Sequence, residues 1–319
     1  MIYIYLLILA ICLFAVIQSS SIIARHLINI SRFLHLSEYI VSFILMAWAT
    51  SMPELFVGLS SALSDKSALS FGNIIGANIV NLSLAIGLII IFCKGIAIKD
   101  QIAKKDSWII FCLAILPVLM AINGKISRGE GFILIALFIW YIIRLFERKE
   151  SYSQKLNSVV YNIKSFKNFI FSLVIFLISI IILLISAWGA VWSAIEIAQA
   201  LDISLLVIGL IIMALGTTLP EIAFGIRSSL LKHQDLSIGN AIGSVVFNSL
   251  LIVGVVAVIN PIIIADFISL KLSGFFLALI LLVFNLFVRT KNRLSYKEGF
   301  ILLALYFVFL FFEIIISQS

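Results

Sequence analysis

The sequence is poor in charged side chains, and this scarcity sets the class of protein. Only 12% of its 319 residues are Asp, Glu, Lys or Arg, whereas 63% are hydrophobic, and the mean hydropathy is +1.24. Soluble domains are roughly 45–50% apolar. An ordinary soluble domain is therefore excluded, and we expect an integral membrane protein whose surroundings are a lipid bilayer.

Cysteine and histidine are also scarce, at three residues each. An odd number of cysteines without metal-like spacing argues against a disulfide framework or a zinc site. The histidines are expected to lie in or near loops in contact with water: His26, His35 and His233. The net charge of +7 does not predict nucleic-acid binding, because no basic, aromatic-interleaved soluble segment is present.

Long apolar runs fill the chain between short polar segments. A transmembrane helix needs about 20 apolar residues, and on this basis we predict ten spans, at about 3–24, 37–63, 70–93, 106–123, 129–146, 168–190, 203–231, 238–259, 268–289 and 296–316. The first run lacks the positive segment of a signal peptide and is expected to be retained. A polar stretch at 147–167 separates two halves of five spans, 1–150 and 168–319, with 151–167 as a linker.

The basic residues predict the orientation in the membrane. With both termini outside, 18 of the 22 Lys and Arg residues fall in or beside cytoplasmic loops, including loop 147–167. Cytoplasmic loops carry an excess of Lys and Arg. We therefore expect a multi-pass protein of the cell membrane with its N-terminus and C-terminus outside.

Proline is scarce as well, and two of the four prolines hold equivalent places in a repeated pattern. The stretch from Met46 to Glu54 recurs from Met213 to Glu221, and aligning 46–87 with 213–254 without a gap gives 17 identities in 42 positions. These identities include Thr, Pro, Glu, Gly and Asn, for which lipid-facing helices have little use. The sequence therefore contains an internal duplication.

The duplication also predicts how the two copies are oriented. Five predicted spans separate equivalent positions, and five is an odd number, so the second copy must cross the membrane in the opposite sense. Inverted repeats of this kind place a shared site near the bilayer midplane and are typical of transporters. The sequence therefore favours a transporter over a receptor or a structural membrane protein.

The two repeated prolines, Pro53 and Pro220, lie inside predicted spans. Proline removes a backbone donor and breaks a helix, which would free carbonyl groups at about 47–50 and 214–217. Such carbonyls need a partner in hydrocarbon. A bound cation could supply one, and so could a Ser or Thr side chain at a simple kink.

Glu54 and Glu221 directly follow these prolines. A carboxylate in the middle of a span costs roughly 2.5–3.5 kcal/mol even on insertion scales. Two carboxylates related by the repeat would meet near the midplane and share a cation or a proton. The alternative is a pair of unrelated residues that face water at helix ends.

Hydroxyl and amide side chains accompany the two carboxylates. Four hydroxyl groups precede the Pro-Glu pairs and can ligate a cation or cap a broken helix: Thr50, Ser51, Thr217 and Thr218. Two amides hold matching places further along, Asn81 and Asn248. An all-oxygen set of this kind suits hard cations such as Ca²⁺ or Na⁺. Each copy also has two glycines four residues apart, a spacing that predicts close helix packing: Gly72 and Gly76, and Gly239 and Gly243.

The two copies resemble the α-repeats of the sodium/calcium exchanger family. The resemblance rests on Ala-Thr-Ser-Met-Pro-Glu with Gly-Asn-Ile-Ile-Gly-Ala-Asn-Ile-Val-Asn, and on Gly-Thr-Thr-Leu-Pro-Glu with Gly-Asn-Ala-Ile-Gly-Ser-Val-Val-Phe-Asn. It implies an all-α membrane protein of ten transmembrane helices in two inverted five-helix repeats. It also implies a calcium/sodium antiporter without a cofactor, in which spans 1 and 6 slide across the rest.

The resemblance further implies the ligands of the transported ions. The Ca²⁺ ligands would be Glu54, Glu221, Thr50 and Thr217. One sodium site would use Ser51, Thr50, Glu54 and the Ala47 carbonyl, and the other would use Thr218, Ser244, Glu221 and the Ala214 carbonyl. Asn81 and Asn248 would complete the centre.

Two positions depart from the family pattern. Ala77 stands where the family has the serine equivalent to Ser244, and Asn248 stands where many prokaryotic members have Asp. The central charge is then two carboxylates, and coupling to H⁺ or transport of another divalent cation stays open beside Na⁺/Ca²⁺ exchange. A cation channel could use the same oxygens. An intramembrane enzyme is disfavoured, because the sequence lacks a catalytic Asp pattern or metal-binding His spacing.

Overall fold

The computed structural model consists almost entirely of helices. It describes residues 2–65, 67–98, 104–147, 164–200, 218–264, 267–290 and 293–318. Within these ranges seven helices are long and apolar enough to cross a membrane, and an eighth span is formed if the helix pair Glu38–Thr50 and Met52–Leu63, bent by 45°, is taken as one. The protein is therefore a multi-pass membrane protein.

The first half of the chain contains these elements, in order: α1 (Ile2–Leu34), α2 (Glu38–Val41), the π-helical turn η1 (Ser42–Met46), α3 (Ala47–Thr50), α4 (Met52–Leu63), α5 (Ser67–Val80), the π-helical turn η2 (Asn81–Ala85), α6 (Ile86–Phe92), β1 (Ile96–Ala97), α8 (Ser107–Met120), the 3₁₀ turn η3 (Ala121–Asn123), β2 (Lys125–Ile126) and α9 (Arg128–Glu147).

The second half contains α11 (Lys164–Ala200), α14 (Leu219–Leu230), α15 (Gln234–Val246), the π-helical turn η5 (Phe247–Ile252), α16 (Val253–Ile259), β3 (Ile262–Ile263), α17 (Phe267–Thr290), β4 (Arg293–Leu294) and α18 (Tyr296–Gln318). Apart from η3, the two halves follow the same order of elements wherever both are described.

The predicted spans agree with these helices, with two corrections in length. The first and sixth spans were expected at 3–24 and 168–190, but α1 continues to Leu34 and α11 covers Lys164–Ala200. Arg25 and Arg32 fall in the loop 25–36 expected between the first two spans, but they are helical residues of α1. The helix continues there because Leu27, Ile28 and Ile30 are buried. The fourth span is a shorter apolar helix, Ser107–Asn123, and most of the seventh lies outside the described residues.

Two long helical segments form the centre of the bundle. In Ser70–Phe92 and in Gln234–Ile259, 78% of the apolar window is buried, against 22–44% in the other long helices. Large aliphatic side chains from both segments share one core cluster, among them Ile79, Leu82 and Leu250. The later parts of the two repeats, 70–87 and 237–254, therefore lie on the long helical segments that are most shielded from the surroundings.

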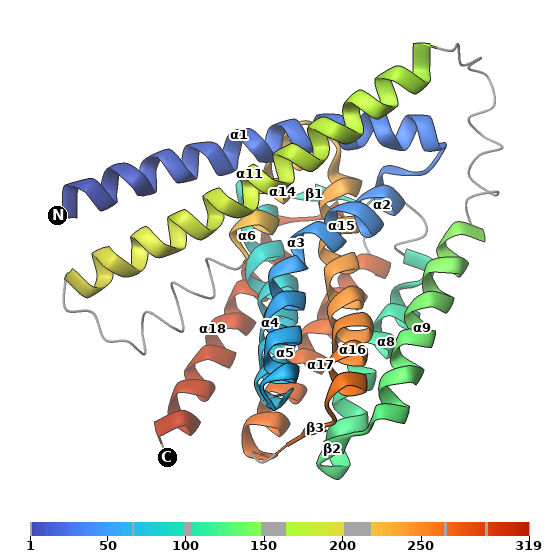
Figure 1. Ribbon diagram of the computed structural model, residues 1–319, viewed down its shortest axis with the longest axis vertical. Helices are drawn as coiled ribbons and strands as arrows, with labels where there is room; N and C mark the ends of the chain where they lie inside the picture. Colours follow the sequence, from blue (N-terminus) through green and yellow to red (C-terminus); the bar gives the residue numbers. More distant parts are fainter. Residues whose placement is uncertain are drawn as a thin grey trace.

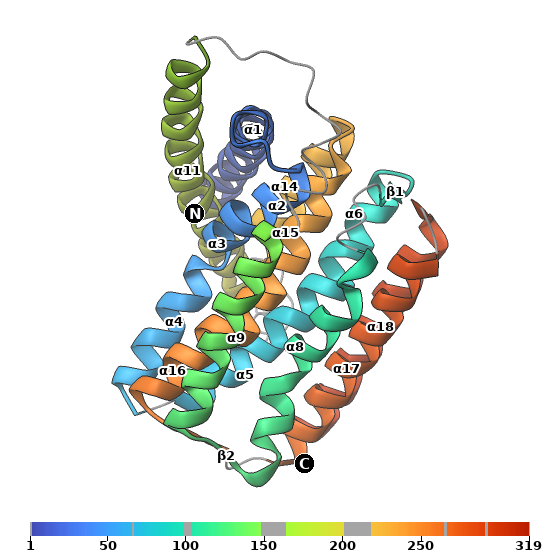
Figure 2. The same ribbon diagram turned by 90° about the vertical axis from the view of Figure 1, so that its right-hand side faces the viewer.

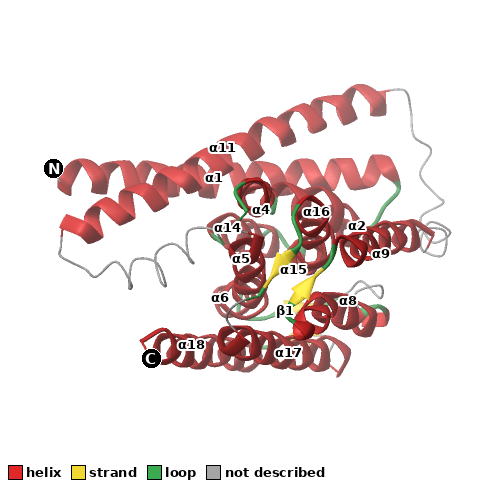
Figure 3. Cartoon of the chain, turned by 60° about the horizontal axis from the view of Figure 1, so that its bottom comes forward, coloured by secondary structure: helices red, strands yellow, loops and turns green. Residues whose placement is uncertain are grey.

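Two short strand pairs join the halves at opposite ends of the bundle, where Figure 2 labels β1 and β2. β1 pairs antiparallel with β4, with Ile96 opposite Leu294. β2 pairs antiparallel with β3, with Ile126 opposite Ile262. All four of these side chains are fully buried, so each pair fixes its register by one inward-facing residue per strand. Figure 3 shows strands as arrows beside the helix ends.

Capping also repeats between the halves. The side chain of Glu130 accepts hydrogen bonds from the backbone N–H and the hydroxyl of Ser127, both at 2.7 Å, at the start of α9. Glu298 accepts the same two bonds from Ser295 at the start of α18, the backbone one at 2.7 Å. Each pair is a capping box, which satisfies donors at a helix N-terminus.

Glycines allow the closest helix contacts, as the sequence predicted for the second copy. A Cβ on Gly239 would lie 2.4 Å from the carbonyl oxygen of Tyr39, and one on Gly243 would lie 2.5 Å from that of Phe43. The helix α15 therefore packs backbone to backbone against α2 and η1. A Cβ added to Gly72 or Gly76 would have no described atom of a neighbouring segment within 4 Å, so the packing role of these two glycines stays a prediction.

The helices α1 and α11 lie side by side and cross the remaining helices at a steep angle (Figure 1). They pack extensively against each other, and α1 contacts the rest of the protein chiefly through α14 and, less, through α2. Among the described residues, the Arg227 Nε of α14 donates a hydrogen bond across this boundary to the Ser21 hydroxyl of α1, at 2.6 Å. The pair α1 and α11 is therefore a separate layer on the bundle.

Candidate cation site

The helix that carries the first motif is broken beside Pro53. The helix α3 ends at Thr50, Ser51 has the non-helical angles φ −86° and ψ 4°, and α4 starts at Met52. Proline lacks the N–H that would continue the helix, which accounts for the break. One expectation is wrong in part, because the Ala47 carbonyl is not freed and accepts the backbone N–H of Ser51 at 3.0 Å.

The second motif has the same local form where it is described. Thr218 is the residue that precedes α14, and Pro220 lies in the first turn, where proline is tolerated. Ala214 and Thr217, predicted ligands, lie outside the described residues. Glu54 and Glu221 thus both occupy the first turn of a helix, where the helix dipole favours a negative charge.

The two carboxylates are buried and lie near each other. Glu54 and Glu221 are 5% and 4% exposed, and their charges are close enough to repel each other. Each has one carboxylate oxygen, Oε2, without a hydrogen-bond partner. A buried charge without a partner is costly, so the pair is the feature of the fold that most requires a bound cation or proton.

Thr50 connects the two halves at this point. Its hydroxyl lies 3.3 Å from Asn240 Oδ1 and 3.4 Å from Ser244 Oγ, both on α15. It also lies 3.1 Å from the Met46 carbonyl and within hydrogen-bonding reach of Glu221. Thr50 and Ser244, predicted to belong to separate ion sites, are therefore in contact.

The other predicted side chains are buried as well. Ser51 and Thr218 are each 1% exposed, Asn81 is 2% exposed, and Asn248 is fully buried. Asn81 is the first residue of η2 and Asn248 is the second residue of η5. Turns of π-helix inside α-helices are frequent at functional sites, and here both copies have one at the amide.

Five oxygens of the predicted set are buried without a partner: Ser51 Oγ, Glu54 Oε2, Glu221 Oε2, Asn81 Oδ1 and Asn248 Oδ1. Unpaired buried polar atoms are rare in folded proteins. Carboxylate, hydroxyl and amide oxygens are the donors that hard cations take. Among the described residues no group of three or more His, Cys, Asp and Glu side chains could hold a metal ion, which fits a site with only two carboxylates.

Sequence reasoning missed three polar residues near the set, namely Asn78, Asn240 and Ser249. Asn240 could have been found, because Asn73 matches it in the first copy. Asn78 and Ser249 are matched by Val245 and Leu82, so the repeat gives no signal for them. They are nonetheless hydrogen-bonded to each other across the two halves at 2.8 Å.

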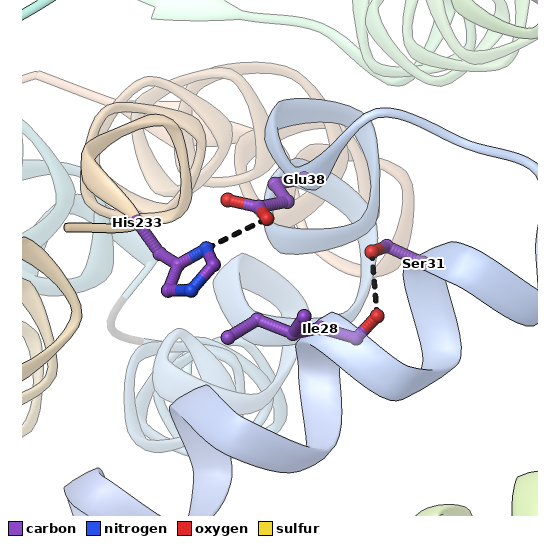
Figure 4. A network of polar contacts seen from close by, with 4 residues as sticks. All are labelled: Ile28, Ser31, Glu38 and His233. Atoms are coloured by element: carbon purple, nitrogen blue, oxygen red, sulfur yellow. Dashed lines mark hydrogen bonds and ion pairs between the residues drawn. The ribbon is translucent and has the colours of Figure 1, made fainter. Parts of the chain in front are cut away.

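The expectation that the histidines lie in or near loops in contact with water is wrong for His26, which lies within α1. His233 does lie in the turn before α15 and is partly exposed, but its side chain also has a carboxylate partner. His233 Nδ1 lies 2.7 Å from Glu38 Oε1 and joins the beginnings of α15 and α2. Figure 4 shows this pair beside α1, where the Ser31 hydroxyl donates to the Ile28 carbonyl. His26 lies within α1 and meets the ring of Phe171 on α11, edge to face, at 6.0 Å. Sequence could not reveal these contacts, because the partners are distant in the chain.

Comparison with known proteins agrees with the sequence and the fold. The family model described as sodium/calcium exchanger protein matches residues 4–146 and 171–315. The putative antiporter CaxA of Alkalimonas amylolytica is 29% identical over 280 residues, which cover 86% of this chain and 88% of the relative. The sodium/calcium exchanger MaX1 of Methanosarcina acetivorans is 26% identical, with 97% and 98% covered.

A solved structure of the sodium-calcium exchanger NCX_Mj, soaked with 2.5 mM Na⁺ and 1 mM Sr²⁺, matches the fold with a TM-score of 0.81 at 25% identity. The match covers 97% of this chain and 98% of the other. The predicted resemblance is confirmed, and the chain belongs to the sodium/calcium exchanger family of membrane transporters.

Proposed function

We propose that this protein is a secondary active antiporter that exchanges Ca²⁺ for Na⁺ by alternating access. The observation that carries the proposal is the buried pair Glu54 and Glu221, each with an unpaired oxygen. Two negative charges that repel each other in the interior need a cation to balance them. The names of MaX1 and NCX_Mj support Na⁺ and Ca²⁺ as the pair of ions.

The Ca²⁺ site comprises Glu54, Glu221 and the backbone carbonyls of Thr50 and Thr217. Sodium takes the flanking places, one with Ser51 and the Ala47 carbonyl, the other with the set Thr218, Ser244 and the Ala214 carbonyl. Asn81 and Asn248 add amide oxygens at the centre. The burial of every described member supports this assignment.

The chain forms ten transmembrane helices in two inverted repeats, 1–150 and 168–319, joined by the linker 151–167. Three pairs of equivalent features support it: the strand pairs β1–β4 and β2–β3, the two capping boxes, and two glycine contacts. In these contacts, Cβ atoms on Gly87 and Gly131 would lie 3.0 Å and 2.8 Å from the carbonyl oxygens of Gly299 and Gly254. The repeat offset of 167 residues relates Gly87 to Gly254, and it relates Gly299 to position 132, which is next to Gly131. The two contacts are therefore equivalent to within one residue.

Alternating access arises from sliding of α1 and α11 across the bundle. Their extensive mutual packing and their limited contact with the other helices support movement as one unit. Both termini lie outside the cell and the loop 147–167 lies in the cytoplasm, because Lys and Arg gather on that side. A channel would not need such a separate layer.

One observation favours a second candidate, exchange of Ca²⁺ for H⁺. Ser244 contacts Thr50 at 3.4 Å, but the equivalent residue of the first copy is Ala77, which has no side-chain oxygen. One sodium place therefore has a ligand fewer, and a proton on a glutamate needs no such ligand. The sodium proposal remains first, because the rest of its oxygen set is present.

The test is uptake of radioactive Ca²⁺ into proteoliposomes loaded with Na⁺, with and without an imposed pH gradient. We expect uptake that requires internal Na⁺, is lost in Glu54→Gln and persists in Glu147→Gln. Glu147 is an exposed glutamate at the end of α9, so it controls for the substitution itself. Uptake driven by the pH gradient alone would establish the second candidate, and the absence of Ca²⁺ flux under either gradient would refute both.

A further inference from the structure

We propose that Asn78, held by Ser249, is a positioning residue that turns the amide of Asn248 so that its carbonyl oxygen is available to the transported cation. The inference rests on the proposed function. It assigns a role to two residues that have no counterpart in the other copy of the repeat.

Three side chains form a chain of hydrogen bonds between the halves. The Asn248 Nδ2 donates to Asn78 Oδ1 at 3.2 Å, and the Asn78 Nδ2 donates to Ser249 Oγ at 2.8 Å. Asn78 lies near the end of α5, whereas Asn248 and Ser249 lie in η5. All three are buried, with exposed fractions of 1%, 0% and 2%.

These hydrogen bonds determine which end of the Asn248 amide is free. An amide has a donor end and an acceptor end of nearly the same shape, and only the oxygen can ligate a cation. Because Asn78 accepts from the NH₂ group, the Asn248 Oδ1 is left, and it is buried without a partner. A flipped amide would bring two N–H donors toward the cation and repel it.

The segments that hold the three hydrogen-bonded side chains lie beside the helices that carry the proposed carboxylate ligands. The helix α4, which carries Glu54, packs against η5, and α14, which carries Glu221, packs against η2. Asn81 is three residues after Asn78 and therefore lies on the same helical face. The chain thus bridges the two segments that carry the central amides.

A purely structural role for Asn78, a polar bridge between α5 and η5, predicts a different result from a positioning role. A carboxylate has two acceptor oxygens and no wrong orientation. If Asn78 serves to orient the amide, its loss weakens Ca²⁺ binding when residue 248 is Asn and has little effect in an Asn248→Asp background. If Asn78 only joins two helices, its loss costs the same in both backgrounds.

The experiment measures equilibrium binding of Ca²⁺ to purified protein in detergent without Na⁺, for wild type, Asn78→Leu, Asn248→Asp and the double variant. We expect Asn78→Leu to weaken Ca²⁺ binding by about tenfold or more, the effect of losing one ligand to a charge. In the Asn248→Asp background, Asn78→Leu should lower the Ca²⁺ affinity by less than about threefold. Transport should show the loss in the KM for Ca²⁺ rather than in the maximal rate.

Ser249→Ala provides a second variant in case Asn78→Leu does not fold, which size-exclusion chromatography and ion-free melting would reveal. It removes the acceptor of the Asn78 NH₂ group and changes the core volume little. We expect Ser249→Ala to lower the Ca²⁺ affinity several-fold when residue 248 is Asn, and to leave it unchanged in the Asn248→Asp background.

The outcomes separate this inference from the proposed function. Equal losses in both backgrounds, or no loss in either, would overturn the role of Asn78 and leave Na⁺/Ca²⁺ exchange intact. A wild-type protein that binds no Ca²⁺, or whose Ca²⁺ binding is not weakened when Na⁺ is then added, would overturn the proposed function and this inference with it.

Discussion

The hydroxyl groups of Thr50 and Ser244 lie 3.4 Å apart, although 194 residues separate them in the chain. Thr50 ends α3 in the first half, and Ser244 lies on α15 in the second. The contact joins hydroxyls from both copies of the duplication, and the Thr50 hydroxyl also lies beside the carboxylate of Glu221. In the first copy the residue equivalent to Ser244 is Ala77, so the site is asymmetric in its hydroxyls.

This asymmetry predicts a gain of function. Ala77→Ser restores the hydroxyl at the position equivalent to Ser244, and we expect it to lower the Na⁺ concentration for half-maximal Ca²⁺ uptake several-fold, because it adds an oxygen ligand. The measurement is uptake into proteoliposomes over a series of internal Na⁺ concentrations. Ala114→Ser on α8, a buried alanine outside the motifs, is the control. Equal Na⁺ dependence in wild type and Ala77→Ser would contradict the role of position 77.

Charge balance predicts how exchange responds to voltage. Glu54 and Glu221 are the two buried carboxylates of the motifs, and in the undescribed segment 201–217 the one charged residue is Asp202, eleven positions before the second motif begins at Met213. One Ca²⁺ or two Na⁺ neutralise them, whereas a third Na⁺ would leave a net charge in the interior, which is costly. We therefore expect two Na⁺ per Ca²⁺ and no effect of a K⁺ diffusion potential, set with valinomycin, on the uptake rate. A rate that changes steeply with the potential would rule out this balance.

The contact of Gly243 with Phe43 predicts a sensitive position in the core. Gly243→Ala places a Cβ 2.5 Å from a carbonyl oxygen and 2.7 Å from the Ala47 Cβ, so α15 must move away from η1. Overpacking of this kind costs typically about 1–3 kcal/mol, and we expect a lower melting temperature together with weaker Ca²⁺ binding. Gly129→Ala is the matched control, because its Cβ would meet only Ser127 Oγ at 4.0 Å. Equal melting temperatures in the two variants would contradict the packing argument.

The layered arrangement of α1 and α11 predicts which cross-links block transport. A Cβ on Gly189 of α11 would lie 2.8 Å from Cys12 Sγ of α1, so Gly189→Cys should form a disulfide within the pair. Because the two helices move together in the proposed mechanism, we expect this bond to spare exchange. A bifunctional thiol reagent that joins Ser21→Cys and Arg227→Cys, across α1 and α14, should abolish exchange until it is reduced. Inhibition by the first bond, or activity with the second, would refute sliding as a unit.

The repeated polar residues of the motifs explain how much could be predicted. Proline and glutamate cannot be placed in a membrane span without a cost, so their recurrence at an offset of 167 identified the broken helix at Thr50–Met52 and the carboxylate pair. The ligand roles of these residues stay a prediction. The strand pairs were missed, because two-residue strands such as Ile96–Ala97 give no periodic signal.

The sequence by itself determined the membrane class, the helical fold and the positions of Glu54 and Glu221, because hydrophobic runs and costly buried charges are local properties of the chain. Only the tertiary structure decided which groups these residues meet. It left the Ala47 carbonyl bonded to Ser51, joined His233 to Glu38, and linked Asn78 to Asn248 and Ser249. The contacts of His233 and Asn78 depend on how the two halves pack, and residues without a like counterpart in the repeat carry no trace of that packing in the sequence.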